Sequence, residues 1–233
     1  MSRKKHCAAY ITNQGLNNII SAREEYKRVR SMRTIASNIQ KEQQEIALWH
    51  EMLAGNVASF ESLIEVTYDL LFQYGNKFCR DRELIKDCIQ DVFLEIWEKK
   101  GSLNHNIPPK AYLLASLRRR LHRMMQKNRM LFLDHLLPDE GFDIAFHAEH
   151  QFIQTEHDQQ IASRITHMLN GLPKRQREAI YLKFFQDMDR DEIAAIMEIH
   201  PQSVSNLLQT AFKFLKTQWR SIVSLFLLLR FMA

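Results

Sequence analysis

The side chains best suited to contact nucleic-acid bases lie between Gln202 and Lys216. At 100° per residue, one polar helix face in this stretch carries Gln202, Ser205, Asn206, Gln209, Thr210, Lys213 and Lys216. Gln and Asn can each make a bidentate contact to adenine, worth about 1–3 kcal/mol of discrimination. The lysines of this face, with Arg175 and Arg177 upstream, could hold phosphates. The alternative is an ordinary solvated face, and no arginine is placed to read guanine.

Two short helices joined by a tight turn would present this face. An apolar spacing of i, i+3 and i+4 predicts a helix from about Arg190, with Ile193, Ile196 and Met197 on its inner side. The chain turns after Ile199, and Pro201 suits the first position of the next helix, where its missing N–H costs nothing. That helix has an apolar face of Val204, Leu207, Leu208, Ala211 and Leu215. The pattern is typical of a helix-turn-helix, although an ordinary αα-hairpin in a helical core has the same spacing.

An acidic stripe lies in "KDCIQDVFLEIWEKK", Lys86–Lys100. Its apolar residues at helical spacing are Ile89, Val92, Phe93 and Ile96. The opposite side carries Asp87, Asp91, Glu95 and Glu98. Leu94 lies beside the acids and Trp97 borders the apolar side, so the stripe could dock a basic partner helix. A solvated acidic face is the alternative.

A basic helix is predicted over Pro109–Met130. Its inward positions are Leu113, Leu117, Leu121 and Met124. One flank gathers Tyr112, Ser116, Arg119, Arg120, Arg123 and Lys127. An aromatic ring within a cationic strip suits a single nucleic-acid strand, because bases can stack while the backbone is neutralised. A soluble basic face is again the alternative.

Composition favours helices throughout. The 233 residues include only six glycines and five prolines, and hydrophobic residues make up 45%. The formal net charge of +5 permits a polyanionic partner without requiring one. Three scattered cysteines and no secretion signal indicate a reducing cytoplasm. No apolar run reaches the roughly 20 residues of a membrane span.

The sequence contains no recognisable catalytic motif. His147, His150 and His157 match no zinc-ligand spacing, and we expect no metal. No glycine-rich phosphate loop, nucleophile elbow or HExxH motif occurs, so neither an enzyme nor a cofactor is expected.

The chain divides by composition into five parts. We expect a basic N-terminal arm over 1–45, a helical domain over 46–130, a flexible acidic linker over 131–158, a second helical domain over 159–219 and an apolar tail over 220–233. Pro138 and Gly141 interrupt any long helix in the linker. Translation could start at Met1 or at Met32.

The order of these features resembles the sigma factors of bacterial RNA polymerase, in the compact extracytoplasmic-function (ECF) class that keeps regions 2 and 4. "DCIQDVFLEIWEKK" is similar to region 2.2, and "PKAYLLASLRRRLHRMMQK" stands where regions 2.3 and 2.4 fall. "LNGLPKRQREAIYLKFFQDMDRDEIAAIMEIHPQSVSNLLQTAFKFLK" is similar to region 4, and "SVSNLL" resembles Bacteroidetes-type members. The resemblance covers about 46–130 and 159–219, and implies an all-α fold of two small domains.

The resemblance also implies partners and site residues. Core polymerase would be bound by Asp87, Gln90, Asp91, Leu94, Glu95 and Trp97. The melted promoter element would lie near Tyr112, Arg119, Arg120, Arg123 and Lys127. The upstream element would be contacted by Arg175, Arg177, Gln202, Ser203, Asn206, Gln209 and Lys213. An anti-sigma factor, often membrane-bound in the family, is implied as a further partner.

Three positions depart from the family pattern. Arg118 and Arg119 stand where the basic helix usually has an Arg-Asn pair. Glu198 replaces the usual turn glycine, and His200 replaces a Ser or Thr cap, which would weaken that helix start by up to about 1 kcal/mol. Two other hypotheses stay open: a free-standing helix-turn-helix regulator, and a helical adaptor with a degenerate DNA face.

Overall fold

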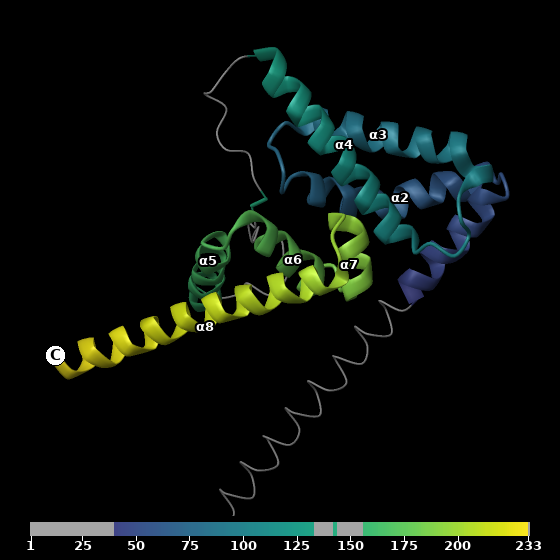
Figure 1. Ribbon diagram of the computed structural model, residues 1–233. Helices are drawn as coiled ribbons and strands as arrows, with labels where there is room; N and C mark the ends of the chain where they lie inside the picture. Colours follow the sequence, from purple (N-terminus) through teal and green to yellow (C-terminus); the bar gives the residue numbers. More distant parts are fainter. Residues whose placement is uncertain (1–39, 133–141, 144–155, 233) are drawn as a thin grey trace, which may run out of the picture. The chain divides into compact units, whose positions relative to one another are not determined.

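The computed structural model describes residues 40–132, 142–143 and 156–232 (Figure 1). The chain forms two compact units, Met1–Leu48 and Trp49–Ala233. In the first unit the described residues, 40–48, are helical. The expected arm over 1–39 and most of the linker, with His147 and His150, lie outside the described residues. Within the described ranges there are helices and no strand, which confirms the predicted all-α fold.

The second unit is built from consecutive helices. A helical stretch ends at residue 53. It is followed by α2 (Val57–Gly75), α3 (Arg82–Lys99), the short 3-10 helix η1 (Lys100–Ser102), α4 (Pro109–Phe132), α5 (Glu156–Asn170), α6 (Lys174–Phe184), α7 (Arg190–Met197) and α8 (Pro201–Met232). Helix α4 therefore runs to Phe132 and α5 already begins at Glu156. Across the described part of the chain, no helix combines the length and apolarity of a membrane span.

Helices α2, α3 and α4 pack against one another (Figure 1). Side-chain caps start two of them: Asn56 accepts from the Ser59 amide before α2, and Asp81 accepts from two amides of the first turn of α3. The end of α2 approaches α3 so closely that a Cβ at Gly75 would lie 2.6 Å from Cγ2 of Ile85. A larger residue at this crossing would therefore force the Ile85 side chain or the helices to shift.

Helices α7 and α8 form the predicted helix-turn-helix. A capping box of Asp189 and Glu192 starts α7 at Arg190. Glu198 ends it in the left-handed conformation, with φ 54° and ψ 50°. This is the backbone state that normally favours glycine. Pro201 begins α8 as expected, and Nδ1 of His200 accepts a hydrogen bond from the Gln202 amide at 3.2 Å. His200 thus acts as an N-cap itself.

Helix α4 is buried on two sides. Leu113, Leu117 and Leu121 are fully buried, as the periodicity predicts. Leu114, Ala115 and Arg118 are also buried, at 0%, 6% and 8% exposure. Helix α7 packs against α4 and accounts for this second buried side.

Candidate nucleic-acid and protein interfaces

The acidic stripe of α3 lies on the exposed side of a helix whose other side is core. Ile89, Val92, Phe93 and Ile96 are all less than 5% exposed. Asp87, Gln90 and Asp91 are exposed, and Leu94 is 52% exposed. An apolar side chain of this size among carboxylates is a suitable contact for the aliphatic part of a basic partner helix.

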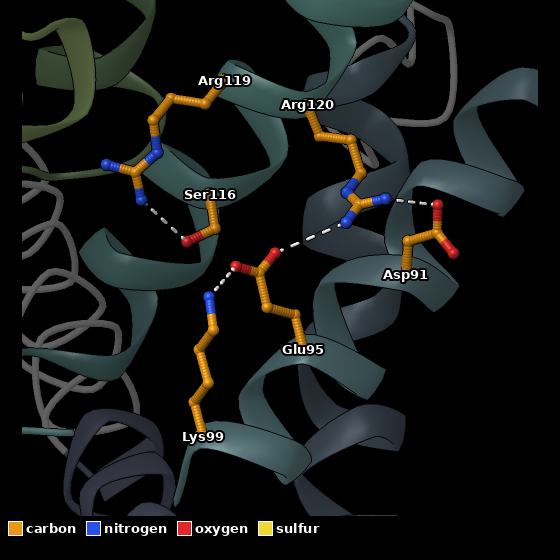
Figure 2. Close-up of polar contacts among 6 residues, drawn as sticks. All are labelled: Asp91, Glu95, Lys99, Ser116, Arg119 and Arg120. Carbon is orange, nitrogen blue, oxygen red and sulfur yellow. Dashed lines mark hydrogen bonds and ion pairs between the residues drawn. The ribbon is translucent and has the colours of Figure 1, made fainter. Parts of the chain in front are cut away.

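Arg120 of α4 joins two of these carboxylates (Figure 2). Its Nη1 donates to Asp91, and its Nη2 donates to Oε2 of Glu95 at 3.4 Å. Lys99 donates to the other oxygen of Glu95 at 2.6 Å. The hydrogen bond from Lys99 lowers the pKa of Glu95 against the effect of burial, and Arg120 adds to the shift. The guanidinium of Arg120 is therefore engaged by α3 in this structure, and its expected role at DNA stays a prediction.

Trp97 borders the stripe as a half-buried ring between two neighbours. Its ring centroid lies 4.8 Å from that of Phe60. Nζ of Lys100 lies 4.1 Å from the same centroid, in cation–π range. Packing by Phe60 and Lys100 fixes the ring at the edge of the stripe, where it can contact a partner.

The basic flank of α4 is only partly open. Arg123 and Lys127 are exposed. Arg119 donates to Oγ of Ser116 at 3.1 Å and faces Glu198 at 3.4 Å (Figure 2 shows the Ser116 contact). Tyr112 is half-buried, with its ring 5.6 Å from that of Trp49.

The polar face of α8 is exposed as the periodicity predicts. Gln202, Ser203, Asn206, Gln209 and Lys213 all lie on the surface. Val204 and Ala211, on the opposite side, are fully buried. Nε2 of Gln202 donates to Oδ1 of Asn206 at 3.3 Å, so the two amides lie side by side on one helical turn. This pair is well suited to adenine contacts.

Two arginines at the start of α6 differ in their surroundings. Arg175 is exposed, as a phosphate contact requires. Arg177 is 8% exposed: its Nη1 pairs with Asp143, and its Nη2 donates to the carbonyls of Asn170 and Leu172 at 2.8 and 2.9 Å. The Arg177 guanidinium is therefore directed inward in this structure and is not placed to contact a phosphate.

A buried polar cluster was not expected. Glu178 of α6, 3% exposed, accepts from Nε of Arg118 at 2.7 Å and from the Tyr74 hydroxyl at 2.8 Å. Burial and then the charge of Glu178 raise the pKa of Tyr74 well above its usual range. Burial acts to lower the pKa of Arg118, but the charge and hydrogen bond of Glu178 outweigh it and raise that pKa. In the sequence, only the position of Arg118 one helical turn after Leu114 indicated that this arginine could be buried.

No candidate metal site accompanies these surfaces. Among the residues that the structure describes, no three His, Cys, Asp or Glu side chains are grouped as metal ligands. Cys79 and Cys88 are buried and form no disulfide, and burial raises the pKa of Cys88 to about 11.

The fold is similar to that of two solved structures. One is "CnrH in complex with the cytosolic domain of CnrY", with 17% identity and a TM-score of 0.51, covering 76% of this chain and 98% of that chain. Another is the sigma factor RpoE in complex with the anti-sigma factor NepR from Bartonella quintana, with 20% identity and a TM-score of 0.51, covering 69% of this chain and 96% of that chain. At these identities the likeness concerns the fold alone. No curated protein matches the chain.

Two family models match the sequence itself. "Sigma-70 region 2" matches residues 63–130, which include α3 and most of α4. "Sigma-70, region 4" matches residues 162–215, which include the helix-turn-helix. Together the two models cover more than half of the 233 residues, in the order in which sigma factors carry these regions. The chain therefore belongs to the sigma-70 family.

Proposed function

We propose that this chain is an ECF-class sigma factor, Bacteroidetes-type by its "SVSNLL" helix, that binds core RNA polymerase and directs it to promoters. It acts in the cytoplasm, without catalysis or cofactor of its own. The observation that carries the proposal is the presence of both regions in one chain, each with an exposed polar surface on a buried apolar core. A free-standing DNA-binding protein would have no use for the acidic stripe of α3.

Core polymerase is bound through α3 in this proposal. Asp87, Asp91 and Glu95 attract a basic helix of the polymerase, while Leu94 and the edge of Trp97 supply apolar contact. The exposure of Leu94 supports this role, because large apolar side chains on a surface are frequent anchors of protein interfaces.

Promoter DNA is bound through two surfaces. In region 2, Tyr112, Arg119, Arg123 and Lys127 contact the melted strand, with stacking on the tyrosine and charge on the phosphates. In region 4, Gln202, Ser203, Asn206 and Gln209 enter the major groove, while Arg175 and Lys213 hold the backbone. Few cations face DNA from α8, so upstream binding depends on polymerase to hold region 4 in place.

An anti-sigma factor is the further partner that we propose. The sigma factor RpoE from Bartonella quintana is described in complex with the anti-sigma factor NepR, and CnrH is described in complex with the cytosolic domain of CnrY. The exposed Phe184 and Phe212, at 57% and 48% exposure with their ring centroids 5.6 Å apart, offer region 4 an apolar contact for it.

The test is in vitro transcription from genomic fragments with core polymerase, with and without the chain. We expect promoter-dependent transcripts only when both are present. Asp87→Arg should abolish them and weaken polymerase binding, because a positive charge then faces the basic partner. The Asp87 side chain makes no hydrogen bond or ion pair within the described residues, so this change leaves the Arg120 contacts intact. Glu65→Arg, an exposed acid of α2, is the matched control.

The two alternatives give different results. A free-standing regulator would bind specific duplex DNA without polymerase, and Asp87→Arg would leave that binding unchanged. A helical adaptor would bind a partner but support no promoter-dependent transcription. Either result would contradict the proposal.

A further inference from the structure

The connection between the two sigma regions contains an anchored pair of residues, Phe142 and Asp143. Phe142 is 2% exposed. Its ring centroid lies 5.2 Å from Phe78, just after α2, and 5.3 Å from Tyr181 of α6. One aromatic side chain of the connection therefore packs against both region 2 and region 4.

Asp143 also contacts both regions. Its amide donates to the carbonyl oxygen of Lys77 at 2.8 Å. Its carboxylate pairs with Arg177 of α6. Burial lowers the pKa of Lys77, and the negative charge of Asp143 opposes that shift. The backbone of Asp143 thus contacts region 2, and its side chain contacts region 4.

The pair with Arg177 matters because that guanidinium is almost completely buried. A buried cation is costly unless it is paired and hydrogen-bonded. The carbonyls of Asn170 and Leu172 provide hydrogen bonds, but Asp143 provides the compensating charge. Removing this carboxylate would leave an uncompensated charge at the interface.

The same interface covers part of the basic flank of α4. Helix α7 packs on α4, and Arg119 faces Glu198 at the end of α7. Lys110, at the start of α4, donates to the carbonyl of Gln186 at 2.7 Å. While region 4 is held here, the flank that we assign to the melted strand is partly occupied by the chain itself.

We propose that Phe142 and Asp143 form an intramolecular clasp that holds region 4 against region 2 in the free chain. Release of the clasp separates the regions and opens the flank of α4. The inference rests on the proposed function in one respect only, the assignment of the melted strand to that flank. The clasp itself is a property of the free chain and can be tested without polymerase.

The experiment is small-angle X-ray scattering of the full chain. Phe142→Ala removes a fully buried ring, and losses of this size shift an equilibrium by about a hundredfold or more. Asp143→Asn keeps the ring and removes only the charge. We expect both variants to scatter as more extended particles with a larger radius of gyration and unchanged helicity by circular dichroism. The matched controls are Phe184→Ala and Asp69→Asn, which remove an exposed ring and an exposed carboxylate.

Scattering curves of both clasp variants identical to the parent would overturn the proposal. If Phe142→Ala loses helicity, Asp143→Asn decides alone. Failure of the clasp would leave transcription by the parent chain intact, whereas failure of the sigma function would leave the scattering result unchanged.

Covering of the α4 flank has its own measurement. Binding of a fluorescent oligothymidine strand should be several-fold stronger for the two clasp variants than for the parent and the controls, and the difference should shrink as salt is raised. Equal binding by all five proteins would refute the covering, whatever the scattering shows.

Discussion

Replacing Glu178 by glutamine removes one negative charge from the interior and leaves the side chain almost the same size. Glu178 accepts from Arg118 at 2.7 and 3.3 Å and from the Tyr74 hydroxyl at 2.8 Å. Both members of the ion pair are less than 10% exposed. After the change, the Arg118 guanidinium would lie buried without a counter-charge.

The expected loss of stability is large for one residue. Breaking a buried ion pair on one side costs about 3–5 kcal/mol, because the remaining charge is uncompensated. For an unfolding slope near 2 kcal/mol per molar urea, this lowers the urea midpoint by about 2 M. The measurement is urea unfolding followed by circular dichroism and by tryptophan fluorescence, whose coincidence would justify a two-state treatment.

Two controls isolate the charge. Glu83→Gln breaks the Lys86 ion pair, which has the same 2.7 Å distance but is exposed, and should leave the midpoint unchanged. Joint replacement by Tyr74→Phe, Arg118→Met and Glu178→Met removes all three polar groups and should recover most of the lost stability. A loss below about 1 kcal/mol for Glu178→Gln would refute the reasoning, since so small a cost is typical of exposed pairs.

Three further changes test local features. Gly75→Ala should destabilise the chain by about 1–3 kcal/mol in urea unfolding, because the new Cβ would overlap Ile85; stability equal to the parent would show that α2 and α3 can move apart. Asp189→Ala should cost about 1 kcal/mol through loss of the α7 cap and weaken duplex binding by region 4, whereas Asp189→Asn should largely retain both. Although the His122 side chain is exposed to solvent on one side, partial desolvation of its ring beside Phe78, and then the charge of Arg118, lower its pKa below the usual 6.5. The unfolded chain therefore takes up this proton first, so stability should fall as pH drops below about 6.5, and His122→Gln should reduce that dependence.

The helices themselves were largely predictable because their apolar spacing is strong. The buried stripe of α3, the start of α7 and the proline that opens α8 all follow from short-range patterns. The position of Glu198 was also marked by the sequence, since glycine is usual there, and the structure places it in the left-handed conformation that explains the preference.

The environments of neighbouring arginines were not predictable. Arg118, Arg119 and Arg120 differ by 100° steps around α4, so each meets a different neighbour. Arg118 pairs with α6, Arg119 lies near the end of α7, and Arg120 pairs with α3. Periodicity gives the direction in which a side chain points from its own helix, but it does not tell which other helix lies in that direction. The burial of Phe142 was also not predictable, because the composition around it is typical of a linker and does not show that one residue packs against Phe78 and Tyr181.

The contacts of Arg120 and Lys99 have a consequence for selectivity. Asp91 and Glu95 are already paired with Arg120 and Lys99. A basic protein that binds these carboxylates must therefore first displace the two internal donors. A scattered set of lysines gains little from that exchange, whereas a rigid row of arginines can replace each bond by a bidentate one. The α3 surface should therefore bind nonspecific polycations weakly and bind tightly only a ligand whose donors match the spacing of its carboxylates.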